Sequence, residues 1–333
     1  MDDSVFITPK KSDNFSTLRG IDLQNLLVEV ESYYLEYRDR LNLPSDVTFG
    51  VEIEYEKMFD SKTRRFINKN VKDWKFKFDA SLVGGGEIVS PIMIDDIKYW
   101  KELEIICNHL NRMRADTLHN AGGHIHVGAT SLGKDMNAWR QFLKLYIAYE
   151  NVLFRFWHGD KLSGRKGLLK YASPSADDLY KKLKYINNIS SLSELSDVIV
   201  NDERYKSLNC RNVRFWGIDY IIDRNTIEFR GPNASTSAVI WQNNINAFTK
   251  MIVSSKEKIM DEEFLDYKLS CEYFPYLGNE YLYNNINLKN VLEFVDLVFD
   301  NNLDKVYFLR QYLKNFEENN GLSVAVKIKK FVK

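Results

Sequence analysis

Several features that would assign this chain to a class at once are scarce or missing. Its three cysteines, Cys107, Cys210 and Cys271, lie far apart and form no CxxC pair, which argues against a disulfide framework or a thiolate zinc site. We expect reduced, partly buried thiols. Lysine plus arginine equals aspartate plus glutamate at 46 each, so no net field draws the chain to nucleic acid or to an anionic membrane.

Long apolar runs are also lacking. No stretch approaches the roughly 18 uninterrupted apolar residues that a membrane-spanning helix needs, and residues 1–15 have no signal-peptide core. We therefore expect a cytoplasmic protein. Hydrophobic residues make up 44% and aromatic residues 14% of the 333 residues, which is enough for one large core or for two modest domains.

The apolar residues change their period along the chain, and this predicts an α+β fold. Helical spacing predicts helices over 21–43, 95–114, 135–157 and 237–259, short helices over 176–200, and a helical segment over 262–333. Alternation predicts antiparallel strands within 47–59, 75–82, 86–91, 124–127, 211–222 and 226–231. Glycine, serine and proline indicate a long loop over 159–175, a kind of segment that often carries function in a compact domain.

The segment AGGHIHVG (121–128) places two of the five histidines one residue apart. In a strand, the period of two sends His124 and His126 to one face and the two apolar side chains beside them to the other. Gly122 and Gly123 fit a place where the backbone must come close to something or bend sharply. Taken alone, two histidines on a solvated sheet face are common and inert, so the interpretation depends on other segments.

Three other predicted strands also present ionisable groups on one face and apolar residues on the other. They contribute Glu52, Glu54 and Glu56 in GVEIEYE, Glu87 in GGGEIVSP, and Glu228 and Arg230 in TIEFRG. Each motif alone is typical of a solvent-facing edge, a turn or a surface ion pair worth less than about 1 kcal/mol. If such carboxylates gather on one sheet face, either the pKa of at least one of them rises or the group binds a cation. Carboxylates with one imidazole per ion suit Mg²⁺ or Mn²⁺ better than zinc.

A carboxylate metal site beside arginines is suited to phosphoryl chemistry, in which the ions offset charge and guanidinium groups hold the transferred group. Arg165 in SGRKG and Arg211 and Arg214 in LNCRNVRF are the candidate arginines. The sequence contains no GxxxxGKS phosphate loop, no GxGxxG after a strand and no nucleophile elbow. If the protein binds a nucleotide, it therefore does so with a binding site of another kind.

Five segments in this order resemble the amidoligase family: FGVEIEYE, FDASLVGGGEIVSP, NAGGHIHVG, SGRKGLLKYASP, and SLN followed by TIEFRGPN. That family is a branch of the carboxylate–amine ligase superfamily, which includes glutamine synthetase and glutamate–cysteine ligase. The resemblance, over about residues 46–250, implies a glutamine-synthetase-like catalytic domain over 46–260, with a curved antiparallel sheet forming a funnel backed by helices. A lead-in and helix over 1–45 would precede it, and a helical extension over 261–333 would follow.

The resemblance also implies a set of metal ligands for two divalent ions, Mg²⁺ or Mn²⁺. The two carboxylates of the ExE pair would each bind a different ion. Glu54 would share its ion with Glu87. Glu52 would share the other ion with His124 and Glu228.

Around these ions the resemblance implies catalytic and nucleotide-binding side chains. Arg230 would face the transferred phosphoryl group, and Asp79 would touch the amine or a metal-bound water. Arg165 matches an arginine in a loop of the family. His126 would lie near the phosphates of ATP, and Asn209 matches the family's LN element, so that both would serve cofactor binding together with the two arginines of LNCRNVRF.

The implied activity is ATP-dependent ligation of a small-molecule or peptide carboxylate to an amine. ATP would phosphorylate the carboxylate, the amine would displace phosphate from the acyl phosphate, and the 159–175 loop would act as a lid that excludes water. Two departures leave the substrates undetermined: Lys166 stands where the family has asparagine, and 176–208 contains no family motif. Residues 262–333 either pack on the domain or mediate assembly into a homo-oligomer.

Three other activities are open to this set of residues. A guanidino kinase of the same fold would rely on arginines where this chain has the ExE pair. A metal-dependent hydrolase would activate water at two ions and would work without ATP. A non-catalytic binding module would keep only a vestigial site, whereas here all the expected ligand positions are filled.

Overall fold

The computed structural model of this chain describes residues 5–7, 12–58, 60–160, 165–199, 205–213, 225–257, 262–273 and 287–314. Within these residues six strands form one antiparallel sheet in the order β2-β3-β1-β4-β6-β5. The strands are β1 (Phe49–Tyr55), β2 (Lys75–Lys77), β3 (Gly86–Val89), β4 (Gly123–Gly128), β5 (Leu208–Asn209) and β6 (Thr226–Phe229). The predicted α+β class and antiparallel pairing are confirmed.

Helices make up most of the remaining described chain. They are α1 (Gly20–Ser32), α2 (Asp60–Asn70), α3 (Ile97–Arg112), α4 (Met136–His158), α5 (Leu168–Tyr171), α6 (Ala176–Lys181), α7 (Leu183–Asn187), α8 (Leu192–Ile199), α9 (Ala238–Glu257), α10 (Glu262–Tyr267), α12 (Leu288–Val298) and α13 (Asn302–Tyr312). Short turns are Phe15–Thr17, Ala129–Ser131 and the π-helical Lys268–Glu272. None of the helices in this part of the chain is long and apolar enough to cross a membrane.

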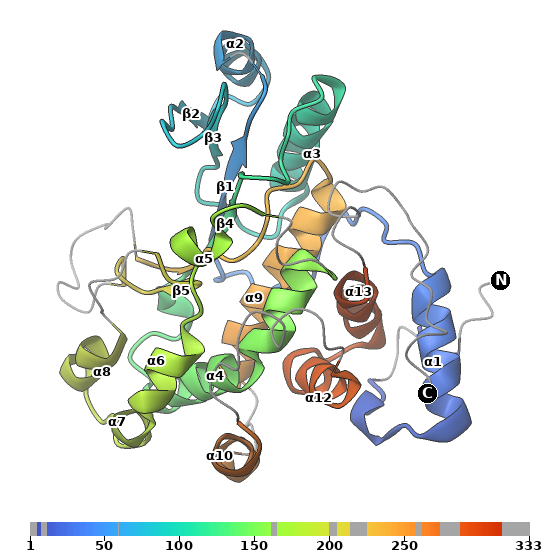
Figure 1. Ribbon diagram of the computed structural model, residues 1–333, viewed down its shortest axis with the longest axis vertical. Coiled ribbons are helices and arrows are strands. Elements are labelled where there is room, and N and C mark those ends of the chain that lie inside the picture. Colours follow the sequence, from blue (N-terminus) through green and yellow to red (C-terminus); the bar gives the residue numbers. More distant parts are fainter. Residues whose placement is uncertain are drawn as a thin grey trace.

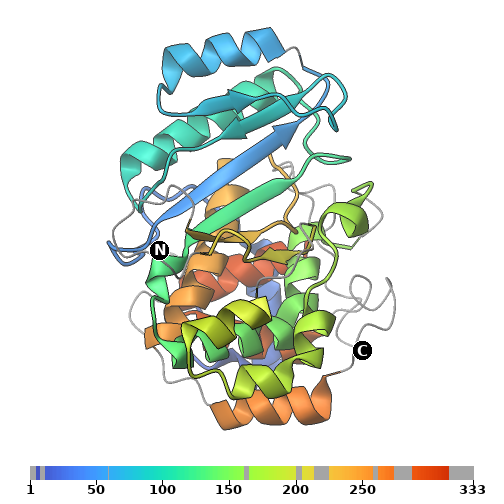
Figure 2. The ribbon, with the colours of Figure 1, turned by 90° about the vertical axis from the view of Figure 1, so that its left-hand side faces the viewer.

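The core lies between one face of the sheet and the helices α3, α4 and α9. Phe229 of β6 stacks on Phe248 of α9 with ring centroids 4.0 Å apart, and it meets Phe142 of α4 edge-on at 6.3 Å. Trp100 of α3 stacks on Phe49 of β1. Helices α12 and α13 pack on α4 and α9, and α1 packs on α13 (Figure 1). Figure 2 shows the strands as one layer beside this helical body, with α2 at the outer edge of the sheet.

The helix predicted over 21–43 ends at Ser32, so the second half of that prediction is wrong. The chain that follows is held by side chains of other elements instead. The backbone N–H of Arg38 donates to Gln242 Oε1 at 3.0 Å, and Asp95 accepts from two further backbone amides at about the same distance. Because these partners satisfy the backbone groups, the segment does not need helical hydrogen bonds.

Other predictions need smaller corrections. Of the strand predicted over 211–222 only 211–213 is described, and it is a turn, because Asn209 Oδ1 accepts the backbone N–H of Arg211 at 3.0 Å. The described part of the 159–175 loop contains the one-turn helix α5. Helix α2 was not predicted, because its mostly polar sequence carries little apolar periodicity. All three cysteines are free thiols, although Cys271 is exposed.

Candidate functional site

The sheet face opposite the aromatic core is polar. In an antiparallel sheet, residues paired on neighbouring strands lie side by side on the same face. The register therefore forms three cross-strand rows of polar side chains: Lys77–Glu87–Glu54 across β2, β3 and β1, Glu52–His124 across β1 and β4, and His126–Glu228–Asn209 across β4, β6 and β5. The predicted convergence of remote acidic strands and the HIHV strand on one face is thus observed.

Ligand atoms on this face gather into two groups. Glu54, Asp79 and Glu87 each have an oxygen within 4.8 Å of the other two, and the same holds for one ligand atom each of Glu52, His126 and Glu228. Donors bound to Mg²⁺ at about 2.1 Å lie no more than about 4.2 Å apart, so both groups have about the spread that one ion requires. Each group could hold a divalent ion after small side-chain adjustments.

The ring of His126 offers a second feature suited to binding a cation. Its Nδ1 lies 3.2 Å from Thr226 Oγ1. Its Nε2 is buried, has no hydrogen-bond partner among the described residues, and lies 3.6 Å from Glu52 Oε1. A buried ring nitrogen without a partner beside carboxylates is a suitable metal ligand. Carboxylates with a single imidazole fit Mg²⁺ or Mn²⁺.

His124 lies between the two groups. Its Nδ1 is 3.0 Å from Glu52 Oε2 and 3.7 Å from Glu228 Oε1, and its Nε2 is 3.6 Å from Glu54 Oε1. The geometry therefore groups His126 with Glu52 and Glu228, whereas the family resemblance implied His124 in that position.

The charges of the face are strongly coupled. Burial favours the neutral form of Glu52, but hydrogen bonds and charges from His124 and His126 outweigh burial and lower its pKa. The pKa of Glu87 is raised by burial and then by the charge of Glu52, and Lys77 offsets only part of this. Burial opposes the charged form of His126, yet the neighbouring carboxylates raise its pKa. The chain thus uses its own cations and protons to neutralise a carboxylate cluster.

Two of the predicted arginines have different surroundings. Arg230 is partly buried; its Nη1 donates to Glu228 Oε1 at 2.5 Å and its Nε donates to the carbonyl of Tyr171 at 3.3 Å. Arg165 is almost fully buried, and its Nη1 donates to the carbonyl of Pro232 at 3.0 Å. Burial lowers the pKa of Arg165, and the charge of Glu54 partly restores it. The described hydrogen bonds of Arg165 anchor the chain that follows β6.

The glycines before His124 make room for this arrangement, as the sequence predicted. A Cβ on Gly122 would lie 2.4 Å from Arg165 Nη2 and 2.9 Å from His124 Nε2. A Cβ on Gly123 would lie 2.4 Å from the carbonyl oxygen of Asn233. Side chains at both positions would therefore push a site residue or the backbone out of place.

The remaining predicted residues divide between the site and its border. Asn209 Nδ2 donates to Glu228 Oε2 at 2.7 Å and so orients that carboxylate. Asp79 is half-buried and accepts hydrogen bonds from the turn that follows it, beside Glu54 and Glu87. Arg211 is exposed in the turn after β5, and Arg214 lies outside the described residues.

Sequence reasoning missed one cation of this face. Lys77 Nζ lies 3.0 Å from Glu87 Oε1 and 3.6 Å from Glu52 Oε1. The alternation of KFKF could have placed Lys77 on this face. Glu56, which alternation groups with the ExE pair, is instead buried in a structural role and accepts the backbone N–H of Val83 at 2.8 Å.

A buried carboxylate beneath the site holds the backbone of Arg230. Glu150 of α4 accepts the backbone N–H of Ser175 at 2.7 Å and of Ala176 at 2.9 Å, and it accepts the hydroxyl of Ser207 at 2.5 Å. The carbonyl of Ser207 accepts the backbone N–H of Arg230 at 2.8 Å. Glu150 therefore fixes the start of α6 and, through Ser207, one side of the site.

We expect Glu150→Gln to lower both stability and turnover. Glutamine keeps one acceptor oxygen and turns an amide toward a buried donor, which leaves a backbone N–H without a partner at a cost of about 1–3 kcal/mol. Thermal unfolding and kcat measure the two effects. The control is Glu102→Gln, which changes a carboxylate away from the site whose described partners are Trp74 and Lys98. It should lower the melting temperature and kcat by less than Glu150→Gln does. Equal melting and equal kcat in both variants would exclude a positioning role for Glu150.

The chain matches a known protein family. A family model described as "putative amidoligase enzyme" matches residues 28–252. Among solved structures, the chain is similar to a bifunctional glutathione synthetase from Pasteurella multocida, with 11% sequence identity and a TM-score of 0.46. The match covers 91% of this chain and 50% of that chain, so this chain spans about half the length of that enzyme. No curated protein sequence matches.

Proposed function

Because the chain belongs to the amidoligase family, we propose that it is an ATP-dependent carbon–nitrogen ligase that joins a carboxylate to an amine. The observation that carries the proposal is the pair of ligand groups, with Arg230 beside one of them, on one polar sheet face. We propose that this face is the floor of a glutamine-synthetase-like site. The carboxylate and the amine are small molecules or peptides.

The reaction that this site suits has two steps. An oxygen of the substrate carboxylate attacks the γ-phosphorus of ATP, ADP leaves, and an acyl phosphate forms. The amine nitrogen then attacks the carbonyl carbon, loses a proton, and phosphate leaves with the former carboxylate oxygen. Activation is needed because hydroxide is a poor leaving group at neutral pH. When bound by the two groups, Mg²⁺ or Mn²⁺ would offset the negative charge of the ATP phosphates.

The residues of the chain position and neutralise the reacting groups. The described hydrogen bonds of Arg230 use Nε and Nη1, and a guanidinium has further N–H donors that can hold a phosphoryl oxygen. Asn209 keeps Glu228 oriented, and Thr226 keeps Nε2 of His126 directed toward the carboxylates. These hydrogen bonds hold the ligand atoms of Glu228 and His126 in place, and such preorganisation is the main source of electrostatic catalysis.

The test is nucleotide turnover against a panel of carboxylates and amines. We expect release of ADP and phosphate that requires both substrates and Mg²⁺ or Mn²⁺. With ¹⁸O in the substrate carboxylate, one labelled oxygen should appear in the released phosphate, and hydroxylamine in place of the amine should give a hydroxamate. Cleavage of an amide substrate without ATP would instead identify a metal-dependent hydrolase, and unlabelled phosphate would exclude the acyl phosphate.

A further inference from the structure

The side-chain amide of Asn233 is a buried polar group that the proposed mechanism does not use. Asn233 follows β6 and is only 3% exposed. Its Oδ1 and its Nδ2 both have no hydrogen-bond partner among the described residues. A buried amide without partners is costly, because it has given up its hydrogen bonds to water and gained none in the protein. Such a group calls for an explanation, and its surroundings indicate one.

The backbone pairing places this amide on the polar face of the sheet. Asn233 forms an antiparallel bridge with Gly122, and residues paired in this way point to the same face. That face is the one that carries His124, because a Cβ on Gly122 would lie 2.9 Å from His124 Nε2. On the other side of Gly122 lies Glu54, whose backbone N–H donates to the carbonyl of Gly122 at 3.1 Å. Asn233 therefore continues the row of Glu87 and Glu54 beyond Gly122.

A buried guanidinium lies beside the amide. Arg165 is 4% exposed, and its Nη1 donates to the carbonyl of Pro232, the residue before Asn233, at 3.0 Å. A Cβ on Gly122 would clash with Nη2 of Arg165, so the guanidinium also lies over the bridge partner of Asn233. Arg230, which we propose to hold the phosphoryl group, precedes Asn233 by three residues. The amide is thus close to one ligand group and to both arginines.

This combination suits an amine nucleophile. Only the neutral amine has the lone pair that attacks a carbonyl carbon. A carboxylate stabilises the ammonium form through its charge, whereas the oxygen of a neutral amide accepts an N–H without favouring that form. The positive charge of Arg165 disfavours ammonium further. The Nδ2 of the same amide can donate to an oxygen that gains negative charge in the reaction.

We propose that Asn233 binds the amine substrate: Oδ1 accepts an N–H of the attacking nitrogen, and Nδ2 donates to the carbonyl oxygen of the acyl phosphate. This inference rests on the proposed ligase function and adds a residue that touches the reacting atoms. In this step the nitrogen lone pair forms the C–N bond, phosphate leaves with the electrons of the C–O bond, and the nitrogen loses a proton to that phosphate. Asn233 orients the nitrogen and transfers no proton. Entry of the amine requires Arg165 to move, because its guanidinium lies over the bridge of Asn233 with Gly122.

Thermal unfolding without ligand tests whether the amide has a structural role instead. Asn233→Ala removes two buried atoms without partners, so its melting temperature should equal or exceed that of the unchanged protein. The matched control is Asn246→Ala on α9, because the amide of Asn246 is also buried without a partner in the described part of the chain, and it should behave alike. Asn243→Ala removes a donor to the carbonyl of Tyr307 at 2.9 Å and should melt lower. If Asn233→Ala melts as low as Asn243→Ala, the amide is structural and the proposal is wrong.

The yield of amide per ADP released measures capture of the acyl phosphate by the amine. Hydroxylamine serves as the amine, together with the carboxylate that supports ADP release in the turnover panel. We expect Asn233→Ala to lower the ratio of hydroxamate to ADP about tenfold, because the amine loses its orienting hydrogen bond while water still cleaves the acyl phosphate. The ratio does not depend on how much of the protein is folded. Asn246→Ala should keep the ratio of the unchanged protein.

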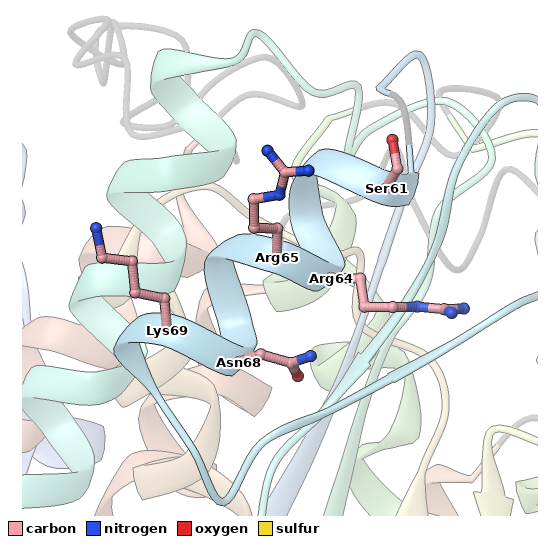
Figure 3. A pocket seen from close by; sticks show the side chains of 5 residues that line it. All are labelled: Ser61, Arg64, Arg65, Asn68 and Lys69. Carbon is pink, nitrogen blue, oxygen red and sulfur yellow. The ribbon is translucent and has the colours of Figure 1, made fainter.

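Asn68→Ala controls for the loss of an amide on the other side of the sheet. An open hollow of about 700 Å³ borders helix α2, and Figure 3 shows its lining residues, which are Ser61, Arg64, Arg65, Asn68 and Lys69. Phe66 of this helix stacks on His109 of α3, with ring centroids 3.7 Å apart. Because α3 packs on the apolar face, the hollow lies away from the ligand groups. The hydroxamate-to-ADP ratio of Asn68→Ala should therefore be unchanged.

Asn233→Asp tests whether the neutral amide matters. Aspartate has nearly the same size and can pair with Arg165, so the fold should survive, but its charge holds a bound amine as ammonium. The yield of amide per ADP should fall more with methylamine than with hydroxylamine, which is the weaker base. Unchanged ratios in both Asn233 variants overturn the inference alone. If no carboxylate supports ADP release by the unchanged protein, the ligase function fails, and this inference fails with it.

Discussion

Replacing Glu54 by glutamine is expected to lower ligase turnover about 10³-fold without unfolding the protein. Glu54 contributes an oxygen to the group it forms with Asp79 and Glu87. Loss of a ligand charge weakens the binding of a metal ion. The stabilisation of phosphoryl charge by such an ion is worth several kcal/mol, and a loss of about 4 kcal/mol corresponds to a 10³-fold lower rate. Turnover under saturating ATP, with Mg²⁺ varied, measures the loss.

The fold should survive because the structural hydrogen bond of Glu54 can be kept. Its Oε2 accepts the backbone N–H of Gly122 at 2.5 Å, a bond that the amide oxygen of glutamine can also accept. The amide group can then donate to Asp79 or Glu87. Because one of several like charges is removed, the melting temperature of the metal-free variant should equal or exceed that of the unchanged protein. The rise in melting temperature on adding Mg²⁺ should disappear.

Glu56→Gln is the matched control within the same strand pattern. The two oxygens of Glu56 accept from Val83 N–H and Asn120 Nδ2, so glutamine loses one buried acceptor. We expect a lower melting temperature and an unchanged Mg²⁺-induced rise, the reverse of the result for Glu54. If Glu54→Gln keeps both turnover and the Mg²⁺-induced rise in melting temperature, Glu54 is not a metal ligand.

The sequence predicts which side chains share a face, because a period of two is a property of the strand itself. Glu52, Glu54, His124 and His126 were placed correctly on this basis, and glycines mark the close backbone approach at Gly122. The start of α3 also depends on a local contact, because the side chain of Asp96 accepts the backbone N–H of Lys98 in the first turn.

Partners across strands depend on register, which contacts far apart in the sequence determine. His126 lies opposite Glu228, and His124 lies opposite Glu52. No local pattern in HIHV distinguishes the two rings. The burial of Arg165 under the chain after β6 is likewise invisible in the SGRKG motif, because it requires the carbonyl of Pro232 to be in place.

Replacing Gly85 by alanine is expected to disrupt the metal centre through the backbone. In GGGE, a Cβ on Gly85 would lie 1.8 Å from the carbonyl oxygen of Tyr55 and 2.7 Å from Cα of Glu56, so β3 and β1 must separate. Glu87 and Glu54 are paired across these two strands. Overpacking of this kind costs about 1–3 kcal/mol or more. We expect a lower melting temperature and a weaker Mg²⁺ response in thermal unfolding.

The neighbouring glycine provides the control that isolates this steric cause. Gly84 has φ of +60° and open space where a Cβ would stand, and asparagine is among the residues that tolerate this left-handed conformation. Gly84→Asn should therefore change the free energy of unfolding by no more than about 0.5 kcal/mol and leave the Mg²⁺-induced rise in melting temperature unchanged. If Gly85→Ala behaves like Gly84→Asn, the approach of the GGGE loop to β1 does not set the separation of Glu54 and Glu87. Suppose that only Gly85→Ala lowers the Mg²⁺-induced rise in melting temperature, while Glu56→Gln lowers the melting temperature but keeps that rise. Then the spacing of β1 and β3, and not stability alone, controls the arrangement of Glu54 and Glu87.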